Sequence, residues 1–382
     1  MSTVAQDVIG LLKDLVGIDS VNPSLSADAA GEAEIAQYVN DWAVKHGLDT
    51  KIVDGGSGRP NVVVRAGTAG GDSPRLLLCG HLDTVGFGRM VDPLVPRIDG
   101  DRLYGRGAYD MKAGLAAALV ACREIDRQGL PIEVVLASVA DEEHASLGIQ
   151  ELLPALKADA AIVTEPTEMA IGVAHKGFVW VDIEVTGVAA HGSRPELGVD
   201  AIAKTGPVLV GLDELNRALA ERKHDLLGPG TVHASLITGG KEVSTIPERC
   251  VLTIERRTLP GESVEDIEQE VHRLLNGCRA ADEHLTASAR TLLHRPPMET
   301  AADEPVVRAL SAAHEQVRGR PAQTSGISYW ADSAFIASLG IPTVLFGPGG
   351  EGAHADVEWV SVSDTVDCTR VLIRAARSLA RG

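Results

Sequence analysis

The chain has 382 residues, of which 45% are hydrophobic and 23% are charged. A chain of this length and composition can bury a large core and usually forms more than one domain. Its formal net charge of −18 argues against nucleic acids and anionic membranes as partners, because both are negatively charged and would repel it.

The N-terminal segment 1–16 lacks a basic stretch followed by an apolar run, so we expect no signal peptide there. Its apolar residues recur at helical spacing, which predicts an amphipathic helix. No segment approaches the about 20 continuous apolar residues needed to span a bilayer. The five cysteines are widely spaced and form no CxxC pair, which favours free thiols in a reducing compartment. We therefore expect a cytoplasmic protein.

The first part of the chain alternates predicted strands with predicted helices. Short apolar runs predict strands at 61–65, 76–79, 133–139 and 160–164, and helices are predicted at 113–125 and 147–156. This alternation predicts an α/β fold with a mostly parallel central sheet and helices on both faces.

The pattern changes at about residue 178. Residues 178–185 alternate apolar and polar side chains, which is typical of a half-exposed antiparallel strand. A helix, two strands, a second helix and a last strand follow, with Ser263 and Asp266 as a capping box for the second helix. The order β-α-β-β-α-β predicts an inserted ferredoxin-like α+β domain over 178–290, which would serve as a lid and dimerisation domain.

The strand and helix alternation resumes after this insertion, with a helix at 306–317, a strand at 341–346 and a terminal helix at 365–379. The larger domain is therefore expected to be discontinuous and to comprise 1–177 and 291–382.

Five segments of this larger domain place His, Asp or Glu where a predicted strand ends or a helix begins. They contain His81 with Asp83, Asp110, the acidic run 141–143, Glu165, and His354 after a glycine-rich stretch. Each alone has an ordinary explanation, such as a buried His–Asp pair, a helix N-cap or a solvated acidic loop. Five together predict a metal site, because open α/β sheets bind ligands at the carboxyl ends of their strands.

His81 and Asp83 are two residues apart on extended chain, which places both side chains on the same side. We expect the Asp83 carboxylate to accept a hydrogen bond from one ring nitrogen of His81, while the other nitrogen faces a metal.

These segments resemble the motifs of the M20 metallopeptidase family. The matching segments are Gly80-His81-Leu82-Asp83-Thr84-Val85, Gly105-Arg106-Gly107 with Asp110-Met111-Lys112, Asp141-Glu142-Glu143, Thr164-Glu165-Pro166, and Gly347-Pro348-Gly349 with Ala353-His354. That family includes acetylornithine deacetylases, succinyl-diaminopimelate desuccinylases, aminoacylases and the glutamate carboxypeptidase of bacteria. The resemblance covers essentially the whole chain in the expected order.

The resemblance implies two metal ions that share Asp110 as a ligand. His81 and Glu165 would complete one site, and Glu143 and His354 the other. Glu142 would be the general base that takes a proton from water and gives it to the leaving amine, with Asp83 also part of the catalytic group. Zinc suits imidazole and carboxylate ligands, and cobalt or manganese would also be compatible.

The resemblance extends to the predicted lid domain. By analogy, His191 would reach the active site of a neighbouring subunit, which implies a homodimer, although a surface-loop histidine is the simpler alternative. Arg257 would bind the substrate carboxylate through its planar guanidinium, whereas Arg256 is expected at the strand surface. Ser244 stands where many relatives of that family have Asn, so we expect different contacts to the substrate backbone there, and Gly349 is a further candidate for substrate binding.

The leading hypothesis is a metal-dependent hydrolase of a small N-acyl-L-amino acid, of acetylornithine deacetylase type. The alternatives are a dipeptidase or carboxypeptidase with the same site and, from a different class, a binding protein without catalysis. The presence of every motif ligand and of Glu142 disfavours the binding protein. The family segment that contains Asp332 is expected to give structural support.

Overall fold

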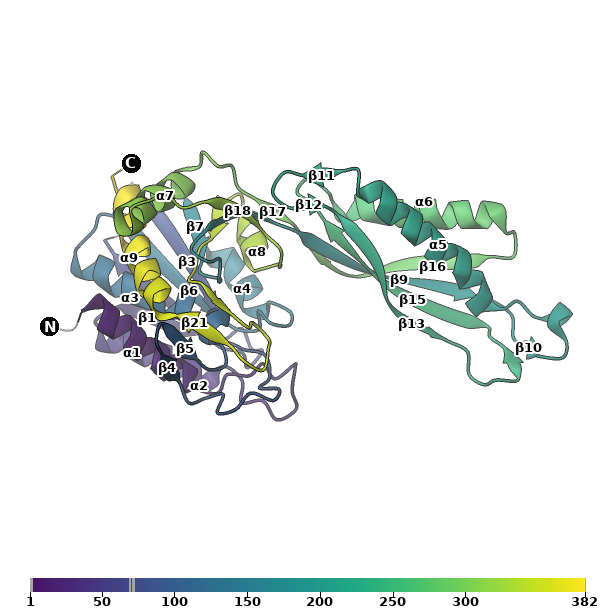
Figure 1. Cartoon of the computed structure of the whole chain (residues 1–382), viewed down its shortest axis with the longest axis horizontal. Coiled ribbons are helices and arrows are strands. Elements are labelled where there is room, and N and C mark those ends of the chain that lie inside the picture. The colour runs from purple at the N-terminus through teal and green to yellow at the C-terminus, as the bar shows by residue number, and fades with distance from the viewer. Residues whose placement is uncertain (1–2, 69, 71–72, 382) are drawn as a thin grey trace. The chain divides into compact units, whose positions relative to one another are not determined.

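The computed structural model describes residues 3–68, 70 and 73–381. The chain divides into two compact units (Figure 1). The first unit comprises Met1–Val173, Glu299–Ser325 and Ala331–Gly382, and the second comprises Ala174–Met298 and Gly326–Trp330. The second unit thus begins four residues before the predicted 178–290 insertion, ends eight residues after it, and gains a short separate segment.

A mixed sheet forms the centre of the first unit. Its strands lie in the order β1 (Asp49–Val53), β2 (Asn61–Gly67), β6 (Glu133–Val139), β3 (Arg75–His81), β7 (Ala160–Val163), β19 (Thr343–Leu345), β8 (Ile171–His175) and β17 (Met298–Glu299), and β18 (Thr324–Ile327) pairs with β8. The four strands β6, β3, β7 and β19 are parallel, whereas β1, β2 and β8 pair antiparallel. The predicted α/β class is confirmed, but the sheet is mixed, with four parallel strands at its centre and antiparallel strands beside them.

The parallel centre follows from helical crossovers and from strands that are buried on both sides. The helix α3 (Ala113–Arg127) lies in the chain between β3 and β6, which allows these two strands to run in the same direction. Leu76, Leu77 and Leu78 of β3 are all buried, as expected for a continuous apolar run covered on both faces.

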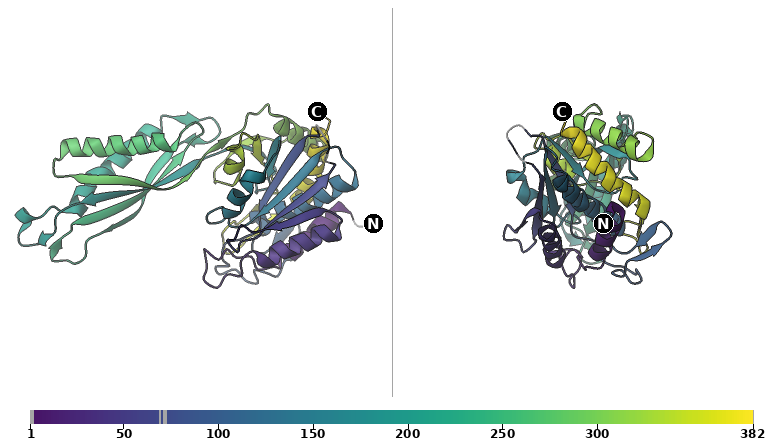
Figure 2. Two further views of the ribbon diagram at one scale, coloured as in Figure 1. Left: turned by 180° about the vertical axis from the view of Figure 1, so that it is seen from behind. Right: turned by 90° about the vertical axis from the view of Figure 1, so that its left-hand side faces the viewer.

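Helices cover one face of this sheet (Figure 2). The helices α3 and α7 (Pro305–Arg318) contact its strands, α1 (Val4–Val16) packs against α3 and α9 (Val362–Leu379), and α9 packs against α3 and α7. Three further helices, α2 (Ala33–Lys45), α4 (Leu147–Leu152) and α8 (Ser333–Ala337), contact β1, β6 and β19 respectively.

A small antiparallel sheet joins two segments that are far apart in the sequence. It has the order β20 (Gly350–Glu351), β21 (Trp359–Ser361), β5 (Arg102–Tyr104) and β4 (Arg97–Asp99). The pairing of β5 with β21 aligns Tyr104 with Trp359. The residues before Asp110 therefore lie beside the residues after His354.

The second unit contains a four-stranded antiparallel sheet and two long helices. The strands lie in the order β13 (Thr231–Gly239), β15 (Arg249–Thr258), β9 (Gly177–Thr186) and β16 (Thr286–Arg295), with α5 (Ala201–Leu219) and α6 (Val264–Ala281) packed against them. The predicted alternation is confirmed, because Val179, Val181, Ile183 and Val185 are all buried in this unit's core. The predicted capping box of Ser263 and Asp266 is present at the start of α6.

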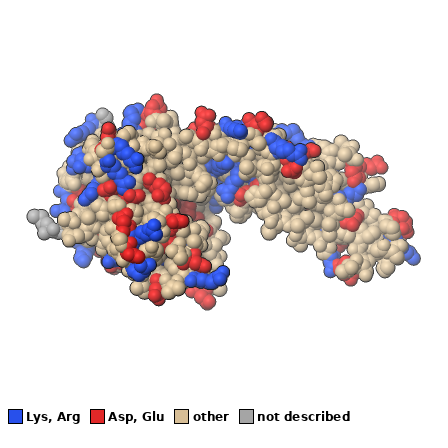
Figure 3. All heavy atoms as spheres, in the orientation of Figure 1, with Lys and Arg blue, Asp and Glu red and all other residues tan. Residues whose placement is uncertain are grey.

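Among the residues that the structure describes, no helix is both long and apolar enough to cross a membrane. On the face drawn in Figure 3, acidic and basic side chains are interspersed over both units rather than separated by sign.

Candidate metal centre

Five side chains of the first unit form two groups with the geometry of metal ligands, and both groups contain Asp110. The first group is His81, Asp110 and Glu165, and the second is Asp110, Glu143 and His354. Within each group, one ligand atom from each residue lies within 4.8 Å of the other two. Five residues from distant parts of the sequence are therefore brought to one place.

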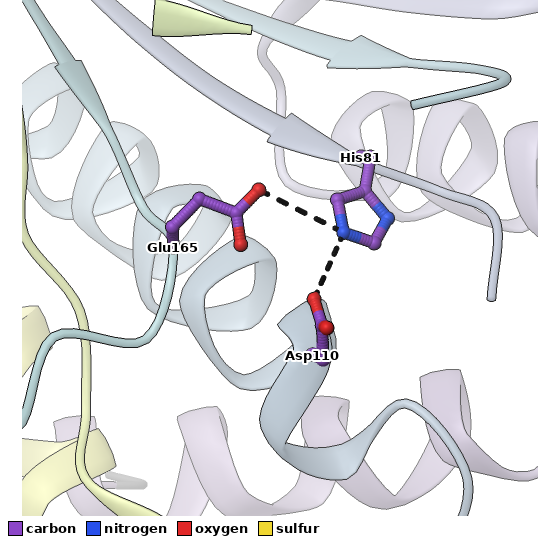
Figure 4. A group of neighbouring side chains, drawn as sticks. All are labelled: His81, Asp110 and Glu165. Carbon is purple, nitrogen blue, oxygen red and sulfur yellow. Dashed lines mark hydrogen bonds and ion pairs between the residues drawn. The ribbon is translucent and has the colours of Figure 1, made fainter. Parts of the chain in front are cut away.

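The first group is buried and is organised around one nitrogen of His81 (Figure 4). Its Nε2 atom lies 3.2 Å from Asp110 Oδ1 and 3.8 Å from Glu165 Oε1. The His81 side chain is only 1% exposed. The ligand atoms of this group therefore lie in a mostly buried part of the first unit.

The second group is more open. His354 Nε2 lies 2.9 Å from Glu143 Oε2 and 3.3 Å from Asp110 Oδ2, and the His354 side chain is 55% exposed. Asp110 thus directs Oδ1 toward His81 and Oδ2 toward His354. One carboxylate facing two ligand groups is the arrangement required for two bridged metal ions.

The parallel strands explain how three of these ligands meet. β3 pairs in parallel with β6 and with β7, so the carboxyl ends of all three strands lie at one edge of the sheet. His81 ends β3, Glu143 follows β6, and Glu165 follows β7.

The other two ligands come from loops. Asp110 lies shortly before α3, whose N-cap is Lys112, and its carboxylate faces the two histidines instead of capping the helix. His354 follows Gly352, which has a φ of 91°, and a Cβ atom there would lie 1.9 Å from the carbonyl oxygen of Val357. Only glycine fits this turn into His354.

Asp83 does accept a hydrogen bond from His81, but through a different atom from the predicted one. His81 Nδ1 lies 2.8 Å from the backbone carbonyl oxygen of Asp83, whereas the nearest carboxylate oxygen is 3.7 Å away. A carbonyl only accepts hydrogen bonds, so this contact assigns the proton to Nδ1 and leaves Nε2 free to face a metal.

The Asp83 carboxylate instead positions the loop that contains the two glutamates. It accepts hydrogen bonds from the backbone N–H groups of Glu142 and Glu143, each at 3.1 Å, and from Asn22 Nδ2 at 2.7 Å. Asp83 therefore accepts hydrogen bonds from the backbone of Glu142 and Glu143 as well as from the ring of His81.

A buried polar network that we did not predict supports Asp83. Asn22 Nδ2 also donates to Asp141 Oδ1 at 3.1 Å, and Asp141 pairs with Arg59 at 3.0 Å. Arg59 in turn donates to Glu32. These residues are separated by tens of positions, and no motif connects them, so only the tertiary structure could identify the network.

Glu142 lies beside the first group but belongs to neither ligand set. Burial and the nearby charge of Glu165 raise the pKa of Glu142 well above its usual range. A carboxylate with a raised pKa, close to the ligands but outside them, suits a group that takes up and releases a proton.

The charges of the site favour cations. Burial, together with the charge of neighbouring carboxylates, raises the pKa of Glu143 and of Glu165. Hydrogen bonds to Asp110 and Glu143 raise the pKa of His354 to about 10. Hydrogen bonds from His354 and His81 outweigh burial and lower the pKa of Asp110. Glu143 Oε1 is buried and has no hydrogen-bond partner among the residues described. The imidazole and carboxylate donors therefore fit a pair of divalent ions.

Gly349 lies in the same unit, and its backbone is already engaged. Its N–H donates to Asp364 Oδ2 at 3.1 Å, and its carbonyl accepts from the backbone N–H of Ser361 at 2.8 Å. Both contacts attach it to the start of α9. A role in substrate binding stays a prediction.

The remaining predicted residues belong to the second unit. His191 is exposed on β10 (Ala190–His191), and its Nδ1 lies 2.8 Å from Ser193 Oγ. The next residue, Gly192, donates its N–H to the carbonyl oxygen of Ser244 at 2.8 Å. The loops that contain His191 and Ser244 are therefore neighbours, and their catalytic and binding roles stay predictions.

The two adjacent arginines of β15 differ. Arg257 is partly exposed, pairs with Glu255 at 2.7 Å and lies over the ring of Phe178, and its role in binding a carboxylate stays a prediction. The expectation that Arg256 lies at the surface is wrong. Arg256 is buried and forms ion pairs with Glu262 at 2.7 Å and with Glu270 at 3.0 Å. These two carboxylates supply the acidic partners that a buried guanidinium requires.

Comparison with known proteins places this site in a family context. A family model described as peptidase family M20/M25/M40 matches residues 77–378. A protein from Myxococcus xanthus named acetylornithine deacetylase is 33% identical over 388 residues, which covers 99% of this chain and 96% of that protein. Another acetylornithine deacetylase, from Proteus mirabilis, is 32% identical over 380 residues and covers 96% and 94%.

Solved structures share the fold. Aminopeptidase PepT from Bacillus cereus has a TM-score of 0.80 at 21% identity and covers 98% of this chain and 99% of that chain. The Bacillus subtilis YXEP protein, described as a dinuclear metal binding peptidase from the M20 family, has a TM-score of 0.76 at 16% identity and covers 98% of both chains.

Proposed function

The chain belongs to peptidase family M20/M25/M40, as its motifs indicated, and we propose that it is a dinuclear metal-dependent deacylase of a small N-acyl-L-amino acid, of acetylornithine deacetylase type. One observation carries the proposal: the two oxygens of Asp110 face two separate ligand groups, each with its own histidine.

His81, Asp110 and Glu165 would hold one ion, and Asp110, Glu143 and His354 the other. Zinc is the proposed metal, with cobalt and manganese as alternatives, because imidazole and carboxylate donors suit all three. When bound, two such ions acidify a water molecule and stabilise the negative charge that develops on the scissile carbonyl.

Glu142 is proposed to take the proton from the attacking water and to give it to the leaving amine. A carboxylate that binds a metal through its oxygens cannot also do this, so the adjacent Glu142 and Glu143 would have separate tasks. The Asp83 carboxylate would keep both in place through their backbone N–H groups.

In the second unit, Arg257 is proposed to bind the substrate carboxylate, with Ser244 and Gly349 as further substrate contacts. His191 is proposed to act at the active site of a partner subunit in a homodimer. The outer strand β13 supports an interface between copies, because Leu236 and Ile237 on it are 67% and 55% exposed. An edge strand with exposed apolar residues readily pairs with another chain.

A deacylase is favoured over a dipeptidase by the relatives. Those at 32–33% identity over nearly the whole chain are named acetylornithine deacetylases, whereas the peptidases among the solved structures are 16–22% identical and support the fold alone. The five free cysteines support a cytoplasmic location, where thiols stay reduced.

The test is a panel of N-acetyl-L-ornithine, other N-acetyl and N-succinyl amino acids, and dipeptides, assayed after chelation and again after zinc or cobalt is restored. We expect metal-dependent release of the acyl group, fastest for an N-acetyl amino acid. Absence of amide cleavage with any metal would refute the proposed function, and faster dipeptide cleavage would favour the alternative.

Two neighbouring variants test the division of tasks. Glu142→Ala should retain two metals per chain and lose about 10²–10⁴-fold in kcat, the usual contribution of a general acid or base. Glu143→Ala should lose one metal. A fully active Glu142→Ala enzyme would show that another group moves the proton.

A further inference from the structure

A buried ion pair outside the ligand set links the two loops that supply Asp110 and His354. Arg106 Nη1 donates to Glu358 Oε2 at 2.8 Å, and each residue is only 2% exposed. Arg106 belongs to the Gly-Arg-Gly motif before Asp110, and Glu358 follows His354 by four residues. Neither contributes an atom to the two ligand groups.

Glu358 fixes the backbone that leads to Asp110. Besides the bond from Arg106, Oε2 accepts from the N–H of Gly107 at 3.0 Å. Oε1 accepts from the N–H of Tyr109 at 2.9 Å and from the N–H of Asp110 at 3.1 Å. One carboxylate thus satisfies three backbone donors, the last of which belongs to the shared ligand.

Arg106 holds the other loop. Its Nη2 donates to the carbonyl oxygen of Ala355 at 2.9 Å, and Ala355 directly follows His354. The pairing of β5 with β21 brings these segments together, because Arg106 follows β5 and Glu358 precedes β21. The ion pair therefore controls the position of Asp110 relative to His354, whose side chains are 3.3 Å apart.

The first ligand group depends less on this pair. His81 ends a buried strand, Glu165 directly follows another, and the backbone hydrogen bonds of β3 with β7 hold them together. The second group places half-exposed His354 on a glycine-rich loop. A ligand on a loop is not held by strand pairing and needs other contacts to fix its position. The ion pair of Arg106 with Glu358 provides them.

We propose that Arg106 and Glu358 are positioning residues that hold His354 against Asp110 and thereby set the metal affinity of the second ligand group. This inference rests on the proposed function, because it assumes that the second group binds a metal. Residues that orient metal ligands from outside typically change metal affinity by about 10–100-fold when they are replaced.

The experiment is a calorimetric titration of metal-free protein with zinc, together with the metal content after dialysis. Glu358→Gln keeps the shape of the side chain, but its amide NH₂ would face backbone N–H donors. We expect the weaker of two binding events to lose about 10–100-fold in affinity while the tighter event changes little. Asp7→Asn is the matched control, because it removes the charge of one of the two acidic partners of buried Arg123, the other being Glu124, and it should leave both affinities unchanged.

A double variant separates positioning from general stability. Arg106→Met with Glu358→Met removes both buried charges, so it should unfold at a higher temperature than Glu358→Gln. The three backbone donors still lack their acceptor, so the second affinity should stay low. Recovery of that affinity together with the melting temperature would overturn the inference. If Glu358→Gln does not fold, the affinity for the second zinc ion is compared between the double variant and the wild-type protein instead.

The outcomes distinguish this inference from the proposed function. A wild-type protein that binds two zinc ions, with a Glu358→Gln variant that binds both equally well or loses both equally, would overturn the positioning role alone. A wild-type protein that binds no metal would overturn both.

Discussion

The two ligand groups differ in how the chain supports them. His81 and Glu165 lie at the ends of parallel buried strands, and His81 is 1% exposed. His354 lies on a loop, and its side chain is 55% exposed. Strand pairing that the whole domain requires places the first pair, whereas the second group depends on specific contacts from Glu358, Arg106 and Asp83. One site thus combines ligands fixed by the fold with ligands fixed by individual hydrogen bonds.

Replacement of Asp110, the residue that the two groups share, should change the enzyme most. Asp110→Asn leaves one oxygen and a neutral amide, so the side chain can no longer provide one carboxylate oxygen to each ligand group. We expect both metals to be lost and activity to fall further than the about 10²–10⁴-fold expected for loss of a general base. Metal analysis and the rate of acyl release check this result. One metal retained at wild-type affinity would show that Asp110 does not bridge the groups.

The next comparison measures the stability of metal-free protein. His81→Ala leaves buried Glu165 without its imidazole partner and Asp110 with His354 alone, and it should cost about 3–5 kcal/mol. His354→Ala removes the half-exposed partner of buried Glu143 and should cost less, about 1–3 kcal/mol. Urea denaturation in a chelator gives both values. Equal losses would mean that the difference in burial between the two groups has no energetic consequence.

Asn22 tests the polar network behind the second group. Asn22→Ala removes the donor shared by Asp83 and Asp141 and should lower stability by about 1–3 kcal/mol. Because Asp83 holds the backbone of Glu143, the second metal should bind about 10–100-fold more weakly. Asn40→Ala on α2 is the control. Unchanged zinc affinity in Asn22→Ala would confine the network to a folding role.

The smallest effect concerns Tyr109, the neighbour of Asp110. Its hydroxyl donates to Glu168 at 2.8 Å, and Glu168 also accepts from the N–H of Gly350 at 3.1 Å. Tyr109→Phe removes one hydrogen bond and should cost about 0.5–1.5 kcal/mol. Its effect on the second metal should be smaller than that of Glu358→Gln. A larger effect in titration calorimetry would make Tyr109 the stronger support of the loop.

The sequence predicted elements well where periodicity and burial agree. β3, β6, β9, α3 and α6 were all expected, because their apolar patterns match the faces that they bury. α2 and β1 were not predicted. β1 is a half-exposed edge strand without a continuous apolar run, so its pattern resembles a loop.

The site shows the same division. His81, Asp110, Glu142, Glu143, Glu165 and His354 could be named from local motifs, because the chemistry of a ligand depends on its residue type and its place at a strand end. Arg256 was misjudged because its acidic partners come from another element, α6, and the loop before it. The hydrogen bond of His81 to the carbonyl of Asp83 was misjudged because spacing alone does not distinguish a carboxylate from a carbonyl of the same residue.

The α/β class, the family, the residue types of the metal ligands and the hydrolytic chemistry that they support could all be read from the amino-acid sequence. The folded chain was needed to see that Asp110 faces two groups, that Asp83 holds the glutamate backbone, and that Glu358 and Arg106 join two loops. The physical reason is that strand and helix propensities act between neighbours in the chain, whereas buried polar groups take partners from any segment that the fold brings within hydrogen-bond distance.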